Sequence, residues 1–275
     1  MGVKKAFFFL FILISLPLLS QEIVVKGKII DSETNKTIAF VNIGIESKNI
    51  GTISNLKGRF RLQVSENNKN NSILISHVNY EPKEITFRNE NNIIIYLQPK
   101  TTTLDEVVVS YKKRKKRKRK IGVKSYNPLL WLRATSKEND IVENAQRINI
   151  PDKRVRVKYI NLYLRRGFDA DSSYVRVNFY ASTINKSPGK KIVFKNILIH
   201  EKIKKGWLKI DVTKEYIYLE EDFFVGIEFI PNFKKPQQVF LGCILTKGKG
   251  YQRGNSQGSW TKLNGGSTIN VELEY

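Results

Sequence analysis

The sequence has very little cysteine and histidine. Among its 275 residues only Cys243 is a cysteine, and only His77 and His200 are histidines. One thiol cannot form an intramolecular disulfide, and a Cys-rich zinc site needs several thiols. Two histidines leave little for metal binding or for a catalytic triad. We therefore expect neither a metal site nor a cofactor.

Long apolar runs are also missing beyond the first 20 residues. A membrane helix needs about 20 apolar residues, whereas the single candidate run, 6–19, is shorter and contains Pro17. It follows Lys4 and Lys5, which is the pattern of a secretory signal peptide, predicted here as residues 1–20. The alternative is retention as an uncleaved anchor. We expect export to the periplasm or to the cell surface, in association with the outer membrane.

Acidic residues are scarce relative to basic ones. The chain has 48 Lys and Arg against 25 Asp and Glu, a formal charge of +23. Residues 21–111 carry 11 basic and 10 acidic side chains, and residues 121–275 carry 26 and 15. The nine residues between them are Lys112, Lys113, Arg114, Lys115, Lys116, Arg117, Lys118, Arg119 and Lys120. Nine adjacent cations repel one another and offer nothing to bury, so 112–120 is predicted to be an exposed linker between two domains.

The segment 21–111 shows the pattern of a small β-sandwich. Short runs of alternating apolar and polar residues are separated by Asn- and Gly-rich breaks, and no helical periodicity competes with them. The predicted strands near its start are 23–29 and 39–45, and those further along are 60–64, 72–76, 84–87 and 93–97. The four residues 55–58, Asn-Leu-Lys-Gly, suit a type I turn.

Several short motifs in this segment resemble the carboxypeptidase-regulatory-like domain. They are Val25-Lys26-Gly27-Lys28-Ile29-Ile30-Asp31, Ala39-Phe40-Val41-Asn42-Ile43, Gly51-Thr52-Ile53-Ser54-Asn55, Gly58-Arg59-Phe60, Leu74-Ile75-Ser76, Tyr80 and Ile95-Tyr96-Leu97. The resemblance covers about residues 22–110. It implies a seven-stranded transthyretin-like Greek-key sandwich that is accessory to whatever follows it.

Residues 104–111, Leu-Asp-Glu-Val-Val-Val-Ser-Tyr, are similar to the segment that ends this domain in TonB-dependent outer-membrane receptors. In those receptors a plug and a large barrel follow. Only 155 residues follow Lys120 here, which is too few for a 22-stranded barrel. We therefore expect no transporter, and interpret 104–111 as a final strand and tether; contact with an energy-coupling protein is the alternative.

The segment 121–275 is predicted to be a second β-sandwich. Its expected strands are 156–164, 174–180, 192–200, 207–212, 223–230, 239–246 and 268–274. About eight strands in this length suit a jelly-roll or galactose-binding-like sandwich. A helix is plausible only around 136–146.

Catalytic constellations are absent from the sequence. His77 and His200 lie in different predicted domains, and neither begins an H-x-x-E or H-E-x-x-H motif. No G-x-S-x-G elbow is present. Cys243 lies in an apolar strand, where a buried and inert thiol is expected. We predict that the protein is not an enzyme, and rank a hydrolase last.

Two features favour binding. The basic run 112–120 would attract phosphate-rich polymers; with export, this points to an anionic envelope polymer or membrane surface and away from nucleic acid. A solvated spacer is the alternative.

The second feature is a set of aromatic residues in the C-terminal domain that could stack on sugars. They are Trp207, Tyr216, Tyr218, Tyr251 and Trp260, of which Trp207 is expected in the core. The polar loop 248–258 makes Tyr251, Arg253 and Trp260 the ligand candidates. The predicted function is non-catalytic adhesion, scaffolding or ligand presentation at the envelope, with another envelope protein as a possible partner; a glycan-binding module is the alternative.

Overall fold

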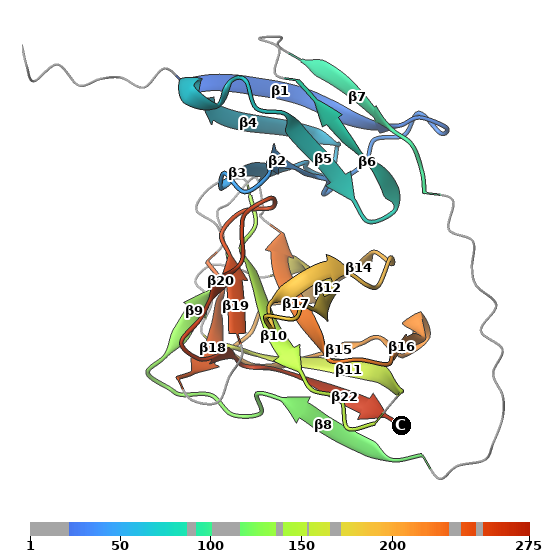
Figure 1. Cartoon of the computed structure of the whole chain (residues 1–275), viewed down its shortest axis with the longest axis vertical. Helices are drawn as coiled ribbons and strands as arrows, with labels where there is room; N and C mark the ends of the chain where they lie inside the picture. The colour runs from blue at the N-terminus through green and yellow to red at the C-terminus, as the bar shows by residue number, and fades with distance from the viewer. Residues whose placement is uncertain are drawn as a thin grey trace, which may run out of the picture.

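The protein is almost entirely β-structure. The computed structural model describes residues 22–86, 92–100, 116–135, 140–152, 154–165, 172–230, 238–245 and 250–275. Two short 3-10 helices, η1 (Glu66–Asn68) and η2 (Thr213–Glu215), interrupt the strands. Within the described ranges, no helix is long and apolar enough to cross a membrane. The predicted fold class, two β-sandwich domains, is confirmed (Figure 1).

The N-terminal domain is a sandwich of seven strands. One sheet has the order β4-β1-β7 and the other β3-β2-β5-β6, with β1 and β7 parallel and the other pairs antiparallel. The strands are β1 (Glu22–Asp31), β2 (Asn42–Ile45), β3 (Ile50–Ile53), β4 (Arg59–Ser65), β5 (Ile73–His77), β6 (Tyr80–Ile85) and β7 (Ile93–Leu97).

The alternation expected from the sequence explains the core of this domain. In β4 the side chains of Phe60, Leu62 and Val64 are buried while their neighbours are exposed, so one face packs against the other sheet. The predicted turn at 55–58 is present. The Gly58 amide donates to the Asn55 carbonyl at 2.8 Å, and Gly58 adopts φ +69°, which glycine tolerates best.

The C-terminal domain has a seven-stranded and an eight-stranded sheet packed face to face. The first has the order β13-β12-β17-β10-β19-β20, with β14 also paired to β12; the second has the order β21-β18-β11-β22-β8, with β15 and β16 paired to β11 and β9 to β18. The strands of the first sheet are β10 (Glu143–Ile148), β12 (Ser172–Ser182), β13 (Pro188–Lys191), β14 (Ile197–Lys202), β17 (Phe223–Ile230), β19 (Gly250–Arg253) and β20 (Thr261–Lys262). Those of the second are β8 (Lys118–Gly122), β9 (Trp131–Arg133), β11 (Val155–Leu164), β15 (Gly206–Asp211), β16 (Ile217–Leu219), β18 (Phe240–Ile244), β21 (Gly266–Ser267) and β22 (Ile269–Glu274).

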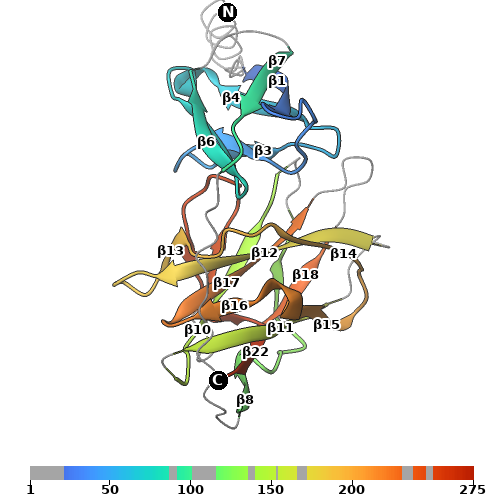
Figure 2. The same ribbon diagram turned by 90° about the vertical axis from the view of Figure 1, so that its right-hand side faces the viewer.

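Between these two sheets lies a core of aliphatic and aromatic side chains. Phe179, Phe223 and Phe229 from the seven-stranded sheet meet Ile160 and Leu162 from β11. Burying each such side chain contributes roughly 1.5–3 kcal/mol. The seven-stranded sheet lies between this core and the N-terminal domain, so its other face is turned toward that domain (Figure 2).

The predicted linker is wrong at its C-terminal end. Lys118, Arg119 and Lys120 belong to β8, which pairs with β22 at the edge of the eight-stranded sheet. Residues 112–115 lie outside the described residues. In this pairing Lys118 and Lys120 lie opposite Glu274 and Glu272, and opposite charges across a ladder favour strand pairing.

Three further expectations in the C-terminal domain are corrected. The suggested helix is wrong for residues 143–146, which begin β10 because both of its neighbours, β17 and β19, supply ladder hydrogen bonds. The predicted strand 192–200 is wrong for its first part: β13 ends at Lys191, residues 192–196 belong to no strand, and β14 begins at Ile197. Trp207 is 44% exposed rather than buried, because it lies on the solvent face of β15.

The two domains are joined by polar and apolar contacts. The Arg176 guanidinium donates to the Phe40 carbonyl at 2.5 Å and to Asn42 Oδ1 at 3.2 Å. The Phe40 ring packs against Tyr174 with centroids 5.1 Å apart. Gln257 Nε2 donates to Ser76 Oγ at 3.0 Å on a second part of the interface. These contacts fix the seven-stranded sheet against the N-terminal domain.

Candidate functional site

The solvent side of the eight-stranded sheet brings together Lys118 and Lys120 of the basic run with Trp207 and Tyr218 of the aromatic set. In β11, Ile160, Leu162 and Leu164 point into the core, so Tyr159 and Tyr163 point outward. We call this surface the outer face. Its members are Lys118, Lys120, Tyr126, Trp131, Arg156, Lys158, Tyr159, Tyr163, Arg165, Trp207, Lys209, Tyr216, Tyr218, Glu272 and Glu274.

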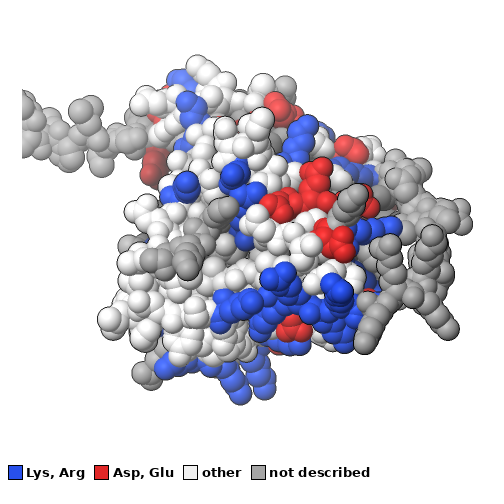
Figure 3. Space-filling model, turned by 60° about the horizontal axis from the view of Figure 1, so that its bottom comes forward, with Lys and Arg blue, Asp and Glu red and all other residues white. Residues whose placement is uncertain are grey.

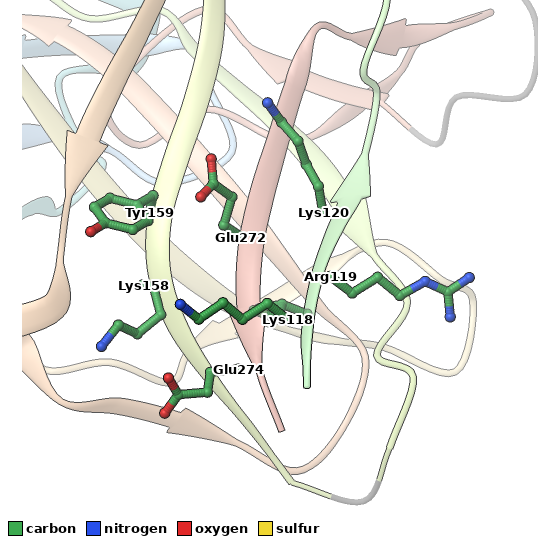
Figure 4. Close-up of a pocket in the computed structure, with 8 residues that line it drawn as sticks. Lys118, Arg119, Lys120, Lys158, Tyr159, Glu272 and Glu274 are labelled. Atoms are coloured by element: carbon green, nitrogen blue, oxygen red, sulfur yellow. The ribbon is translucent and has the colours of Figure 1, made fainter. Parts of the chain in front are cut away.

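A shallow groove of about 400 Å³ lies on the outer face over β22 and its two neighbours, β8 and β11. It is lined by Lys118, Arg119, Lys120, Lys158, Tyr159, Glu272, Leu273 and Glu274. Lys118 reaches across β22 toward Lys158, whereas the Arg119 side chain extends away from the others (Figure 4). The space-filling view shows basic side chains gathered on this side of the molecule around a small acidic patch (Figure 3).

The two carboxylates in the groove already have partners. Glu274 accepts from Lys116 Nζ at 3.0 Å, and this neighbour helps to hold the pKa of the Glu274 carboxyl below its usual value although partial burial acts to raise it. Glu272 accepts from Lys209 Nζ at 3.2 Å and from Asn161 Nδ2 at 3.2 Å. Lys118, Lys120 and Lys158 thus leave the groove with more cations than carboxylates.

Aromatic rings alternate with the cations along the outer face. Lys120 Nζ lies 5.4 Å from the Trp207 ring, and Lys209 Nζ lies 3.7 Å from the Tyr159 ring. Trp207 packs edge-on against Tyr163 with centroids 5.4 Å apart. Cation–ring contacts of this kind contribute about 0.5–1 kcal/mol at exposed sites. They also hold the lysine side chains over the sheet rather than extended into solvent.

Both ends of the outer face repeat this pattern. At one end the Arg165 guanidinium lies 4.4 Å from the exposed Trp131 ring. At the other end the Arg156 guanidinium lies 4.7 Å from Tyr216 and 5.8 Å from Tyr218. The surface therefore presents cations and flat apolar rings together, which suits a polymer that carries both negative groups and sugar-like faces.

The three residues predicted to bind ligand from a loop lie elsewhere. Tyr251 and Arg253 form part of β19 in the seven-stranded sheet, and residues 246–249 are outside the described part of the chain. Tyr251 is buried and packs edge-on against Phe224 at 5.5 Å. Trp260 is half-buried against Tyr180 and Arg253. The prediction of a flexible loop is therefore wrong for Tyr251 and Arg253, because both are held in the ladder to β10.

Arg253 belongs to a buried charge cluster on the seven-stranded sheet. Its guanidinium pairs with Glu143 at 2.6 Å and lies 3.8 Å from Glu228. The Tyr180 hydroxyl donates to Glu143 at 2.8 Å, and burial raises the pKa of Tyr180 well above its usual value. Arg253 therefore neutralises a fully buried carboxylate, a structural role that its sequence position did not indicate.

The remaining members of the cluster come from β12, β13 and β17. Arg176 pairs with Glu228 at 3.1 Å, and Asn178 donates to both Glu143 and Glu228 at 2.8 Å. Lys191 Nζ donates to Asn178 Oδ1 at 2.9 Å. The sequence contained a signal for this buried charge cluster. Arg176 and Asn178 alternate with Val175 and Val177, and polar residues repeated along a buried strand require buried partners.

The chemistry-bearing residues singled out for catalysis do not converge. Cys243 is buried in β18, and burial raises the pKa of its thiol, as expected for an inert cysteine. His77 lies in β5 of the N-terminal domain and His200 in β14 of the C-terminal domain, where it stacks on Tyr174 at 4.5 Å. Across the described ranges, no three His, Cys, Asp or Glu side chains are grouped so that they could hold a metal ion.

Comparison with known families identifies the N-terminal domain. Residues 25–109 match the family model described as the CarboxypepD_reg-like domain. The N-terminal sandwich is therefore a carboxypeptidase-regulatory-like domain, as its motifs indicated. The match does not extend to the C-terminal domain that carries the outer face.

Other comparisons add little about this chain. No curated protein matches the sequence. Among solved structures, the crystal structure of a DUF3823 family protein from Bacteroides ovatus ATCC 8483 is similar at 12% identity, over 82% of this chain and 97% of that chain. The TM-score of 0.20 is too low for this likeness to bear on fold or function.

Proposed function

We propose that this protein is an exported, non-catalytic binding protein of a Gram-negative envelope, and that its outer face binds an anionic polymer. The carboxypeptidase-regulatory-like domain would be the accessory module, and the C-terminal sandwich the binding module. The observation that carries the proposal is the position of Lys118 and Lys120. Both belong to a strand, and their side chains share one surface with Trp207, Tyr159 and Lys209.

The strand geometry supports a polymeric ligand. Residues two apart on a strand lie about 6.5–7 Å from each other on the same face, so Lys118 and Lys120 present two cations at a fixed spacing. Arg156 and Lys158 extend the positive surface along β11. A linear chain of phosphates or carboxylates could contact several of these cations at once, whereas a small ion could contact only one or two.

Export is proposed from the N-terminal sequence. Lys4 and Lys5, the apolar run 6–19 and Ser20 have the order of a secretory signal. N-terminal sequencing of protein recovered from a periplasmic or outer-membrane fraction tests this, with cleavage near residue 20 expected. Recovery only in the cytoplasm, with the first 20 residues intact, would contradict it.

Residues 104–111 are proposed to be a tether rather than a contact for an energy-coupling protein. They lie outside the described residues, and the exported chain requires some connection between the two domains. A copurification experiment with the coupling protein tests the alternative; stable association through 104–111 would contradict the tether.

Binding should be measured on immobilised anionic polysaccharide and on lipopolysaccharide at several salt concentrations. The logarithm of the affinity should fall linearly with the logarithm of the salt concentration, because bound counterions are released. Lys118→Gln/Lys120→Gln should weaken binding at low salt about tenfold or more and reduce the salt slope. Lys48→Gln/Lys57→Gln, which removes two exposed cations from the N-terminal domain, is the matched control and should have little effect.

The glycan-binding alternative predicts a different pattern for the same surface. If sugar stacking dominates, Trp207→Ala should abolish binding while salt has little effect. Under the anionic-polymer proposal, Trp207→Ala weakens binding but leaves the salt slope largely unchanged. If both double-lysine variants lost the same amount of affinity, binding would depend only on the net charge of the protein. That result would contradict a defined binding site on the outer face.

A further inference from the structure

A second cavity lies between the two domains, on the side of the seven-stranded sheet away from the outer face. Its volume is about 200 Å³. It is lined by Asn42, Ser76, His77, Val78, Tyr80, Pro82, Lys100, Arg176, Lys191, Phe194 and Asn196. Pro82, Phe194 and Asn196 are exposed, so they form the solvent edge of the cavity. The cavity is independent of the outer face and of the function proposed for it.

Three cations and no carboxylate line this interdomain cavity. They are Lys100 from the end of the N-terminal domain, and Arg176 and Lys191 from β12 and β13. His77 lies beside them as a neutral ring: burial and these three cations lower its pKa to about 3. Within the described lining, the local charge is therefore positive at neutral pH.

The buried cluster behind the cavity does not neutralise this charge. Its ionisable members are the cations Arg176, Lys191 and Arg253 and the carboxylates Glu143 and Glu228, so one positive charge remains. Arg176 pairs with Glu228 and Arg253 with Glu143, whereas Lys191 donates to the neutral Asn178 amide. Arg176 is 4% exposed, and its Nε has no hydrogen-bond partner. Excess positive charge in a buried cluster is costly, and an anionic group in the cavity would offset that cost.

The other lining residues offer hydrogen bonds and a flat ring. The polar groups are those of Asn42, Ser76 and Asn196, and Phe194 is 56% exposed with Lys100 Nζ 5.6 Å from its ring centroid. The volume lies below the roughly 300–1,000 Å³ of pockets for drug-sized ligands. This combination suits one small unit with several hydroxyl groups, a flat face and one negative charge.

We propose that the interdomain cavity binds the carboxylate of a single acidic sugar, such as a uronic acid, with Lys191 and Lys100 as its cationic contacts. The hydroxyl groups of the sugar would bond to the amide and hydroxyl side chains, and its ring would lie against Phe194. Because both domains line the cavity, a bound sugar also holds them together.

Calorimetric titration of the full mature chain with glucuronate tests this, with glucose and acetate as comparisons. Glucuronate should bind more tightly than either, since glucose lacks the charge and acetate lacks the hydroxyl groups. Lys191→Gln should weaken glucuronate binding at least about tenfold, the loss that corresponds to one charge-assisted hydrogen bond. Lys190→Gln, the exposed neighbour on the same strand, is the matched control and should bind like the wild type.

Lys100→Gln is a second variant, because Lys100 lies outside the buried cluster and its loss is not expected to disturb folding. It should also weaken glucuronate binding. The proposal is overturned if glucuronate binds no better than glucose or acetate, or if Lys190→Gln lowers the affinity as much as Lys191→Gln and Lys100→Gln. Lys118→Gln/Lys120→Gln should leave this titration unchanged, so failure here and failure of the outer face can be told apart.

Discussion

At the residue scale, the informative side chains are the buried ionisable ones. Asp140 is 1% exposed and accepts hydrogen bonds from the Ile141 and Ser256 amides. Burial nevertheless outweighs these bonds and raises its pKa to about 6. Ser256 in turn donates to the Thr52 carbonyl in the N-terminal domain, so Asp140 supports an interdomain contact.

The raised pKa of Asp140 predicts a pH dependence of stability. A carboxyl that is easier to protonate in the folded state stabilises the fold below its unfolded pKa of 3.8 and loses that contribution as the pH rises through about 6. The free energy of unfolding should therefore fall between pH 4 and 7 by about 2–3 kcal/mol from this group. Chemical denaturation of the wild type and of Asp140→Asn measures it. An equal slope in both proteins would contradict the assignment.

Arg253 and Glu143 give a second prediction at this scale. Arg253→Met leaves the Glu143 carboxylate, which is 0% exposed, without its cation. Stability should fall by about 3–5 kcal/mol, whereas polymer binding by the folded protein should be retained. The double variant Arg253→Met/Glu143→Gln should recover much of the loss, because residue 143 is then neutral and needs no cation. Loss of binding without loss of stability would instead support Arg253 as a ligand contact.

At the scale of the element, the strand pattern could be predicted where one face is apolar. The alternation in β4 predicted which of its side chains are buried, and the motifs of the N-terminal domain predicted its seven strands. The pattern failed where pairing with strands distant in the sequence determines the secondary structure. β8 contains three consecutive cations, yet it forms a strand because it pairs with β22, where carboxylates lie opposite Lys118 and Lys120. β10 contains Glu143 and Asn144 at buried positions, which no local pattern distinguishes from a helix surface.

The candidate sites, too, could be predicted only as far as they depend on local sequence. The sequence identified Trp207, Tyr216 and Tyr218 as an aromatic set and the basic run as a separate feature. It could not show that one surface carries both, because their strands are far apart in the chain. The outer face depends on the pairings of β11 with β15 and of β22 with β8, which are long-range contacts.

Gly226 in β17 gives a prediction for an element. A Cβ atom there would collide with Glu143 Oε1 and lie 2.9 Å from Tyr180 Cε2, so the buried charge cluster requires glycine. Gly226→Ala should destabilise the protein by about 1–3 kcal/mol or more, as overpacking does. Gly254→Ala is the control, since nothing lies within 4 Å of the added atom. Thermal denaturation compares the two. Similar melting temperatures would contradict the close packing around Glu143.

At the scale of the whole molecule, the two sandwiches form one unit. Arg176 spans the interface by pairing with Glu228 in its own domain and donating to the Phe40 carbonyl in the other. Phe40 adopts φ +59°, an unfavourable conformation for a bulky residue, and its ring packs against Tyr174. Such strain persists only where the surrounding contacts outweigh it.

The interface predicts how the molecule unfolds. The wild type should unfold in a single cooperative transition, because each domain supports the other. Tyr174→Ala removes the ring that packs on Phe40 and should separate this into two transitions in a calorimetric scan. Tyr216→Ala, which removes an exposed ring between η2 and β16, far from this interface, should not. A single transition in Tyr174→Ala at the wild-type temperature would contradict domain coupling through this contact.

The central claim is that the outer face of the eight-stranded sheet holds an anionic polymer. Hydrogen–deuterium exchange on the mature chain, with and without a saturating anionic polysaccharide at low salt, tests it most directly. Protection is predicted in β8, β11, β15 and β22, with little change in β19 and β20. Protection confined to β19 and β20, or no protection while the polymer is bound, would contradict the account.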